Sequence, residues 1–232
     1  MTSDPATPRV AAAAANHTTG IADAQALAVL RNTYRLLAMT LAFSALVAGV
    51  SAALRLPYPG LLLTLGGYFG LLFLTSYLRN SGWGLLAVFA LTGFMGYTLG
   101  PLLAAYLSLP NGSQLIMAAM GTTAIVFVGL SWYAGREGAI DMLRFGNFLM
   151  IGILTAFCLG LAAYFLAMPA LAAAVSAIFV LLMSGLILYQ TQAIIRGGER
   201  NYITATVTLY VAIYNLFASL LQMFGLLGGE DA

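Results

Sequence analysis

The chain has 232 residues, of which 62% are hydrophobic and only 7% are charged, whereas an average soluble domain carries about 25% charged residues. Nine arginines and seven acidic residues are too few to cover a water-facing surface, so the composition indicates a membrane protein and excludes a nucleic-acid-binding protein. The absence of lysine excludes any mechanism through a lysine Schiff base. One histidine, His17, and one cysteine, Cys158, exclude a histidine-rich metal site and an internal disulfide.

Charged residues and turn signals divide the chain into seven apolar segments, each close to the roughly 20 residues that a helix needs to cross a bilayer. The turn sequence of residues 109–113 and the pair Met168 and Pro169 divide the two longest uncharged runs. The predicted spans are 36–54, 56–78, 83–107, 114–134, 145–167, 170–194 and 201–229. Cys158, in an apolar run of the fifth span, is expected to be a buried and inert thiol. The pattern predicts an all-α membrane protein, a seven-transmembrane-helix bundle.

The arginines predict how this bundle is oriented in the membrane. With a cytoplasmic N-terminus, eight of the nine arginines lie in segments inside the cell and only Arg55 lies outside. Residues 1–30 lack the continuous apolar core of a signal peptide. We therefore expect three parts: a flexible cytoplasmic tail over 1–30, which could become helical from Ile21 onward, a transmembrane domain over 31–229, and a short C-terminal tail over 230–232.

The last span carries a polar stripe. Five polar residues on it fall within an arc of roughly 60° at about 100° per residue, namely Thr204, Thr208, Asn215, Ser219 and Gln222. Polar side chains are costly against lipid, so this stripe is expected to face protein or a water-filled cavity. With Tyr210 and Tyr214 on another face, it predicts a largely buried seventh helix. Hydrogen bonds between helices and a conduction path are both compatible with the stripe.

Other features favour packing over chemistry. Gly66 with Gly70, and Gly96 with Gly100, have the spacing of close helix contacts. The loop before the fifth span groups acidic and basic residues in the manner of ordinary surface ion pairs, namely Arg136, Glu137, Asp141 and Arg144. The interior of the spans contains no Asp or Glu, so we expect neither an enzyme nor a bound metal or cofactor.

Several motifs occur together in order along the chain: TGFMGYTLGPL at 92–102, GLILYQTQ at 185–192, GGE at 197–199, NYI at 201–203 and LYVAIYNLF at 209–217. In this set the chain resembles the Bax inhibitor-1 family, and in particular its bacterial YccA-like branch. The resemblance implies six helices around a central seventh and a place in the bacterial inner membrane, where seven spans and the arginine distribution put the C-terminus on the periplasmic side. It also implies two activities, a pH-sensitive calcium leak and modulation of the membrane-anchored AAA protease FtsH.

The leak of this family depends on two aspartates and one arginine. By motif those positions are Gln190, Ala212 and Arg79 in this chain, so only the arginine is retained. Glutamine and alanine can neither hold a cation between carboxylates nor share a proton near neutral pH. Arg79 could act as an anchor at the inner interface or as a surviving latch.

Two functional hypotheses follow. The first is an interaction protein that binds FtsH, with the N-terminal tail as the part that the protease engages. The second is a leak for calcium or another cation along the stripe of the last helix. Membrane lipids and FtsH are the expected partners, calcium is the partner that the second hypothesis adds, and nucleic acid is not expected.

Overall fold

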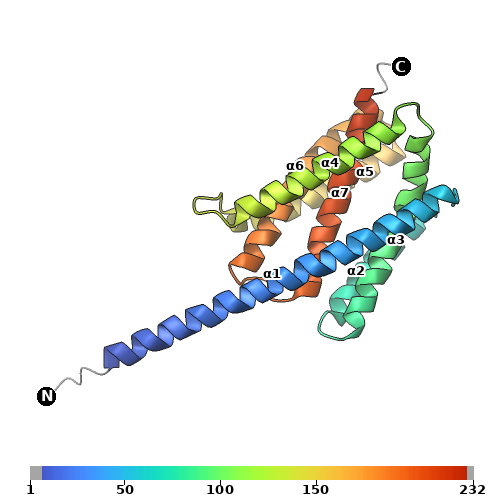
Figure 1. Cartoon of the computed structure of the whole chain (residues 1–232). Helices are drawn as coiled ribbons and strands as arrows, with labels where there is room; N and C mark the ends of the chain where they lie inside the picture. Colours follow the sequence, from blue (N-terminus) through green and yellow to red (C-terminus); the bar gives the residue numbers. More distant parts are fainter. Residues whose placement is uncertain (1–6, 229–232) are drawn as a thin grey trace.

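The computed structural model of the chain describes residues 7–228, with the side chains of residues 24–226. Its helices form one bundle from which the N-terminal part of the first helix projects (Figure 1). In chain order the described elements are α1 (Thr7–Ala53), α2 (Leu61–Leu78), α3 (Trp83–Leu107), α4 (Gly112–Ala134), the short 3-10 helix η1 (Met142–Phe145), α5 (Gly146–Phe165), α6 (Pro169–Ile195) and α7 (Tyr202–Gly228).

The predicted membrane fold is confirmed. Within the described residues, seven helical segments are long and apolar enough to cross a membrane. The second helix, α2, begins at Leu61 and not at the predicted residue 56, because Pro57 and Pro59 disfavour helical backbone at the residues before them.

The first helix is longer than its membrane span. α1 is a continuous helix of 47 residues, and its part within residues 24–53 is long and apolar enough to cross a membrane. The division into a flexible tail over 1–30 and a bundle over 31–229 stays a prediction. Residues 1–6 and the short C-terminal tail at 230–232 lie outside the described residues.

The seventh helix is central. It packs against α1, α3, α4 and α6, and Figure 1 shows its ribbon in the middle of the bundle. One face of α7 places small and leucine side chains at steps of three or four residues, and Ala205, Leu209, Ala212 and Leu216 are fully buried. By contrast, α2 packs chiefly on α3, and α5 packs chiefly on α6.

Two expectations about packing need correction. Cys158 is exposed on α5 instead of buried. The buried residues of this helix, Leu149, Ala156 and Ala163, recur every seven residues, and Cys158, two residues beyond Ala156, lies on nearly the opposite face, which is open to lipid.

The glycine pairs also behave differently from each other. A Cβ atom on Gly96 would lie 2.5 Å from the Ser44 carbonyl oxygen, and one on Gly100 would overlap the Ser51 side chain. This pair therefore lets α1 and α3 approach closely, as expected. On Gly66 or Gly70 a Cβ atom would meet no described atom within 4 Å, so these two glycines make no such contact inside the described chain.

Candidate functional site

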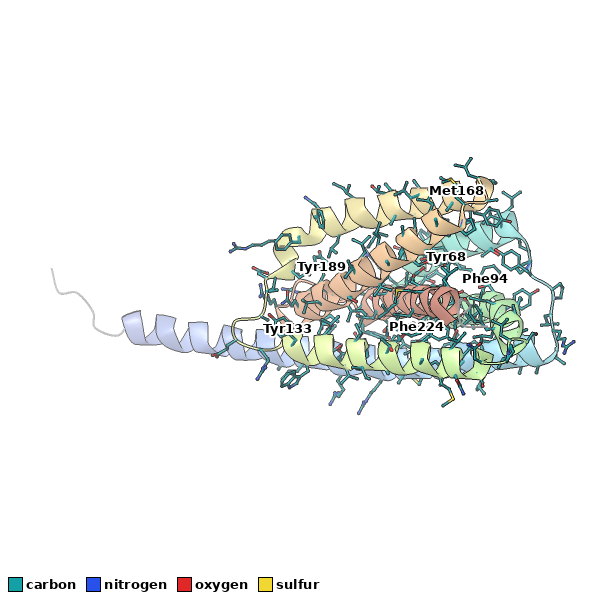
Figure 2. The ribbon with its side chains drawn as sticks, turned by 90° about the horizontal axis from the view of Figure 1, so that it is seen from above. Tyr68, Phe94, Tyr133, Met168, Tyr189 and Phe224 are labelled. Carbon is teal, nitrogen blue, oxygen red and sulfur yellow. The ribbon has the colours of Figure 1, made fainter. Side chains whose placement is uncertain are left out.

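The loops at one end of the bundle carry most of the arginines. The loops after α2, α4 and α6 lie at this end, together with the projecting part of α1 (Figure 1). In Figure 2, the labelled Tyr133 and Tyr189 lie at the same end, whereas Met168 marks the opposite one. We call it the arginine-rich end. Arg55, in the loop after α1, lies at the other end.

The turn from α6 to α7 is fixed by backbone hydrogen bonds. The carbonyl of Ala193 accepts hydrogen bonds from the N–H groups of Gly198 (2.8 Å) and Glu199 (2.9 Å). Gly197 has φ +70°, a conformation that glycine adopts without steric cost. This local geometry ends α6 and sets the position at which α7 begins.

Asn201 connects the start of α7 to the loop after α2. Its Oδ1 accepts hydrogen bonds from the N–H groups of Ile203 (3.0 Å) and Thr204 (3.2 Å), as a helix N-cap does. Its Nδ2 donates to the carbonyl of Arg79 (3.1 Å) and to Oδ1 of Asn80 (2.9 Å). The sequence contained Asn201 within a family motif but gave no sign of this cross-link, which depends on the loop after α2.

Arg79 itself is held through its backbone. Its side chain is exposed, and among residues 24–226 its guanidinium takes part in no ion pair, the two ion pairs both belonging to Asp141. Gln190 is 5% exposed and its Nε2 has no hydrogen-bond partner among the described residues. Ala212 is fully buried in the core of the bundle. No hydrogen bond or ion pair among the described side chains thus joins these three family positions.

Gln192 fixes the loop before α5. Its side chain is fully buried. Its Oε1 accepts a hydrogen bond from the N–H of Met142 (2.9 Å), and its Nε2 donates to the carbonyl of Ile140 (2.8 Å). Sequence reasoning grouped Gln192 with other polar residues at the end of the sixth span and missed this role, because its partners lie about 50 residues earlier in the chain.

The residue between these two backbone partners, Asp141, forms the ion pairs of the loop. Its carboxylate oxygens lie 2.7 Å from Nη1 of Arg196 and 3.2 Å from Nε of Arg144. The pair with Arg144 agrees with the expected mixed cluster, whereas the pair with Arg196 was not expected. Arg136 instead stacks over the ring of Trp132, with its guanidinium carbon 4.1 Å from the ring centre.

The polar stripe of α7 makes mostly local hydrogen bonds. The Oγ1 of Thr208 donates to the Thr204 carbonyl (3.0 Å), and the Nδ2 of Asn215 donates to the Val211 carbonyl (2.8 Å). Ser219 is buried. The Oγ1 of Thr204 is buried with no partner among the described side chains and backbone. Gln222 is the stripe residue that reaches another helix, since its Oε1 accepts a hydrogen bond from Oγ of Ser176 on α6 (2.8 Å).

Hydrogen bonds from α7 to its other neighbours come from residues outside the stripe. The hydroxyls of Tyr210 and Ser44 lie 2.5 Å apart, and the Tyr210 hydroxyl also donates to the Thr92 carbonyl (3.3 Å). One residue therefore links α7 to α1 and α3. Thr206 donates to the Thr33 carbonyl of α1 (3.3 Å). A tyrosine in an apolar helix gives a weak signal in sequence, which is why this junction was missed.

Two mostly apolar cavities lie on either side of α7. One, of about 540 Å³, is bounded by α1, α3, α4 and α7. The other, of about 430 Å³, is bounded by α2, α3, α5, α6 and α7, and Asn215 of the stripe contributes to its wall. In the part of the chain with described side chains, no group of three or more His, Cys, Asp or Glu residues is placed to hold a metal ion.

Known proteins with similar sequences agree with the membrane fold and with the family motifs between residues 92 and 217. The family described as "Inhibitor of apoptosis-promoting Bax1" matches residues 26–229. An uncharacterized protein of Pseudomonas aeruginosa is 57% identical over 203 residues, which is 88% of this chain and 91% of that protein. YccA of Escherichia coli K12, named a modulator of FtsH protease, is 51% identical over 197 residues, which is 85% of this chain and 89% of YccA. An uncharacterized membrane protein of Vibrio cholerae is 39% identical over 204 residues, or 88% of this chain and 91% of that protein.

A family match over nearly the whole chain after its first 25 residues, together with relatives above 30% identity over most of their length, shows the family independently of the motifs. The chain is a multi-pass membrane protein that belongs to the Bax inhibitor-1 family.

Proposed function

We propose that the protein binds the membrane protease FtsH in the bacterial inner membrane and modulates its activity. The observation that carries this proposal is the 51% identity to a relative named for that role, over 89% of the relative's length. Identity of that level over the whole bundle is compatible with retention of a binding surface as well as of the fold. The relative modulates a protease and is not named as one, which agrees with a role other than enzyme.

The projecting part of α1 is the segment that we expect the protease to engage. It leaves the bundle at the arginine-rich end (Figure 1). The distribution of arginines supports a cytoplasmic location for that end and a periplasmic C-terminus.

Association is tested by affinity capture of tagged FtsH from membranes that contain the full chain. A second sample carries a chain without residues 2–25, and a third replaces residues 2–23 by a glycine and serine segment of equal length. We expect capture of the full chain and a several-fold loss in both altered chains. Loss only in the shortened chain would assign the effect to the length of the arm. No capture of any of the three would refute the proposal.

Orientation has its own test. Cys158→Ala removes the single cysteine, and single cysteines are then introduced at Ser81, in the loop after α2, or at Ser108, in the loop after α3. A maleimide that does not cross the membrane should label Ser108→Cys in intact cells and Ser81→Cys only after permeabilisation. The reverse pattern would refute a cytoplasmic N-terminus.

The alternative of a calcium or cation leak is not favoured. Neither Gln190 nor Ala212 carries a carboxylate, and two residues of the stripe bond their own helix instead of presenting polar atoms to a path. For Arg79 we propose the anchoring role. An exposed guanidinium with no ion pair among the described residues is typical of an arginine that reaches the membrane interface.

A further inference from the structure

The helices α2 and α5 form two walls of one cavity. These two helices lie on different neighbours, α3 and α6. Between them the rings of Phe69 on α2 and Phe157 on α5 meet edge to face, with centroids 5.8 Å apart. The cavity has a volume of about 430 Å³, and its walls are mostly apolar and include Phe179 and Leu186 of α6. Figure 2 shows Tyr68 and Phe94, which also line this cavity, beside the ribbon of α7.

A second, polar cavity follows on the same helix. It has a volume of about 260 Å³ and is lined by Tyr189, Gln190, Arg196 and Glu199, among others. Gln190 lies four residues after Leu186, which is about 6 Å along a helix. Along α6, an apolar cavity is therefore followed, toward the arginine-rich end, by a polar cavity.

The polar cavity contains a donor that has nothing to bind. Only 5% of Gln190 is exposed, and its Nε2 has no hydrogen-bond partner among the described residues. Among the described residues five buried side-chain atoms lack a partner; four are hydroxyl oxygens, and Gln190 Nε2 is the amide nitrogen. Because buried donors are usually paired and Gln190 also lines a cavity, this amide points to an acceptor supplied from outside the chain. The amide N–H groups of glutamine require an oxygen acceptor such as a phosphate oxygen.

The charged groups around this donor have both signs. Arg196 uses Nη1 for Asp141, and a guanidinium has five N–H donors, so others can contact a phosphate. Glu199 accepts a hydrogen bond from the N–H of Asn201 (2.8 Å) and brings a carboxylate to the same cavity. A cation and an anion side by side suit a zwitterionic headgroup better than a purely anionic one.

We propose that a phospholipid with an ethanolamine headgroup binds at these two cavities. One acyl chain enters between α2 and α5 and fills the apolar cavity, the phosphate accepts hydrogen bonds from Gln190 and Arg196, and the ammonium lies near Glu199. The medium around the spanning helices is hydrocarbon, and an apolar cavity does not hold water. The acyl chain therefore packs against the apolar wall of the cavity, and the phosphate of the headgroup accepts the hydrogen bond that Gln190 Nε2 can donate.

The acyl chain is tested with the full chain in bilayer discs of phosphatidylethanolamine and phosphatidylcholine, in which a small fraction of the ethanolamine lipid carries a photoreactive group in its acyl chain. After irradiation we expect cross-links on the cavity walls, at Phe157 and Phe179. Ile153→Trp fills the cavity from α5 and should reduce these cross-links at least fivefold. The matched control is Ile151→Trp, on the exposed face of the same helix, which should leave them unchanged.

A second variant keeps the test decisive if Ile153→Trp fails to fold. Leu154 lines the cavity and is 65% exposed, so Leu154→Trp can block the entrance without overpacking the core. Cross-links spread evenly over the bundle surface, or unchanged in both blocking variants, would overturn the proposal.

The headgroup is tested by native mass spectrometry of the detergent-solubilised chain with added phosphatidylethanolamine or phosphatidylglycerol. We expect at least threefold more retention of the ethanolamine lipid, and a loss of this preference in Gln190→Leu, which removes the donor, and in Glu199→Gln. Equal retention of the two lipids by the unaltered chain would overturn the proposed headgroup contacts.

Discussion

Replacement of Gln192 by alanine should release the loop that precedes α5. The fully buried amide makes two hydrogen bonds to the backbone of this loop, at 2.9 and 2.8 Å. A net contribution of about 0.5 to 1.5 kcal/mol for each bond gives about 1 to 3 kcal/mol for the pair. The replacement frees the N–H of Met142 and the carbonyl of Ile140. Because Ile140 is exposed, water can reach these groups, and we expect a loss in the lower half of this range.

Hydrogen exchange of the backbone amides measures this directly. The amide of Met142 loses its acceptor in Gln192→Ala, and a loss of 1 to 2 kcal/mol corresponds to roughly 5- to 30-fold faster exchange through opening of the loop. The control is Gln114→Ala, at an exposed position of α4, which should leave exchange at Met142 unchanged. Unaltered exchange in Gln192→Ala would show that the ion pairs of Asp141 hold the loop without Gln192, and the reasoning would be refuted.

Three further expectations concern other parts of the bundle. Asp141→Asn should lower stability by less than about 1 kcal/mol, because its ion pairs are solvent-accessible; a large drop in the thermal midpoint would contradict this. Gly96→Ala should destabilise the bundle by about 1 to 3 kcal/mol by forcing apart two helices, whereas Gly66→Ala, with open space around it, should be neutral or stabilising by up to about 1 kcal/mol. Equal midpoints for the two glycine variants would disprove that difference. In liposomes of the pure protein, calcium flux should be weak and nearly constant from about pH 6 to 8, since no span interior carries an acidic residue. A steep pH dependence of the flux in the unaltered chain, which lacks the two family aspartates at Gln190 and Ala212, would show that other groups gate it.

The fold could be predicted because the membrane leaves few choices. Uncharged runs of about 20 residues can be satisfied only as helices in lipid, and arginines and prolines mark where those helices end. The burial of α7 followed from its polar stripe and its tyrosines. The prediction that Cys158 is buried was wrong, because an apolar run has the same composition whether a face meets protein or lipid.

The contacts of the site could be predicted only in part. Gln192 and Asn201 bond loops that are about 50 and 120 residues away in the chain, and no periodicity within one helix reports such distances. For the same reason Arg196 was missed as the partner of Asp141. The family positions Arg79, Gln190 and Ala212 stay predictions from the motifs. The lack of a hydrogen bond between the described side chains of Arg79 and Gln190 depends on side-chain directions that motifs do not contain.

The length of α2 has a consequence for the surrounding bilayer. Its 18 residues span about 27 Å, which is slightly less than the roughly 30 Å of hydrocarbon in a typical bilayer. A short helix with one main neighbour cannot compensate by tilting, since tilt shortens its reach further. The mismatch is instead met by local thinning of the lipid and by flanking side chains, such as Arg79, that reach the interface. The protein should therefore be better accommodated by thin bilayers than by thick ones, and bilayer thickness would then act on the bundle mainly through the α2 side.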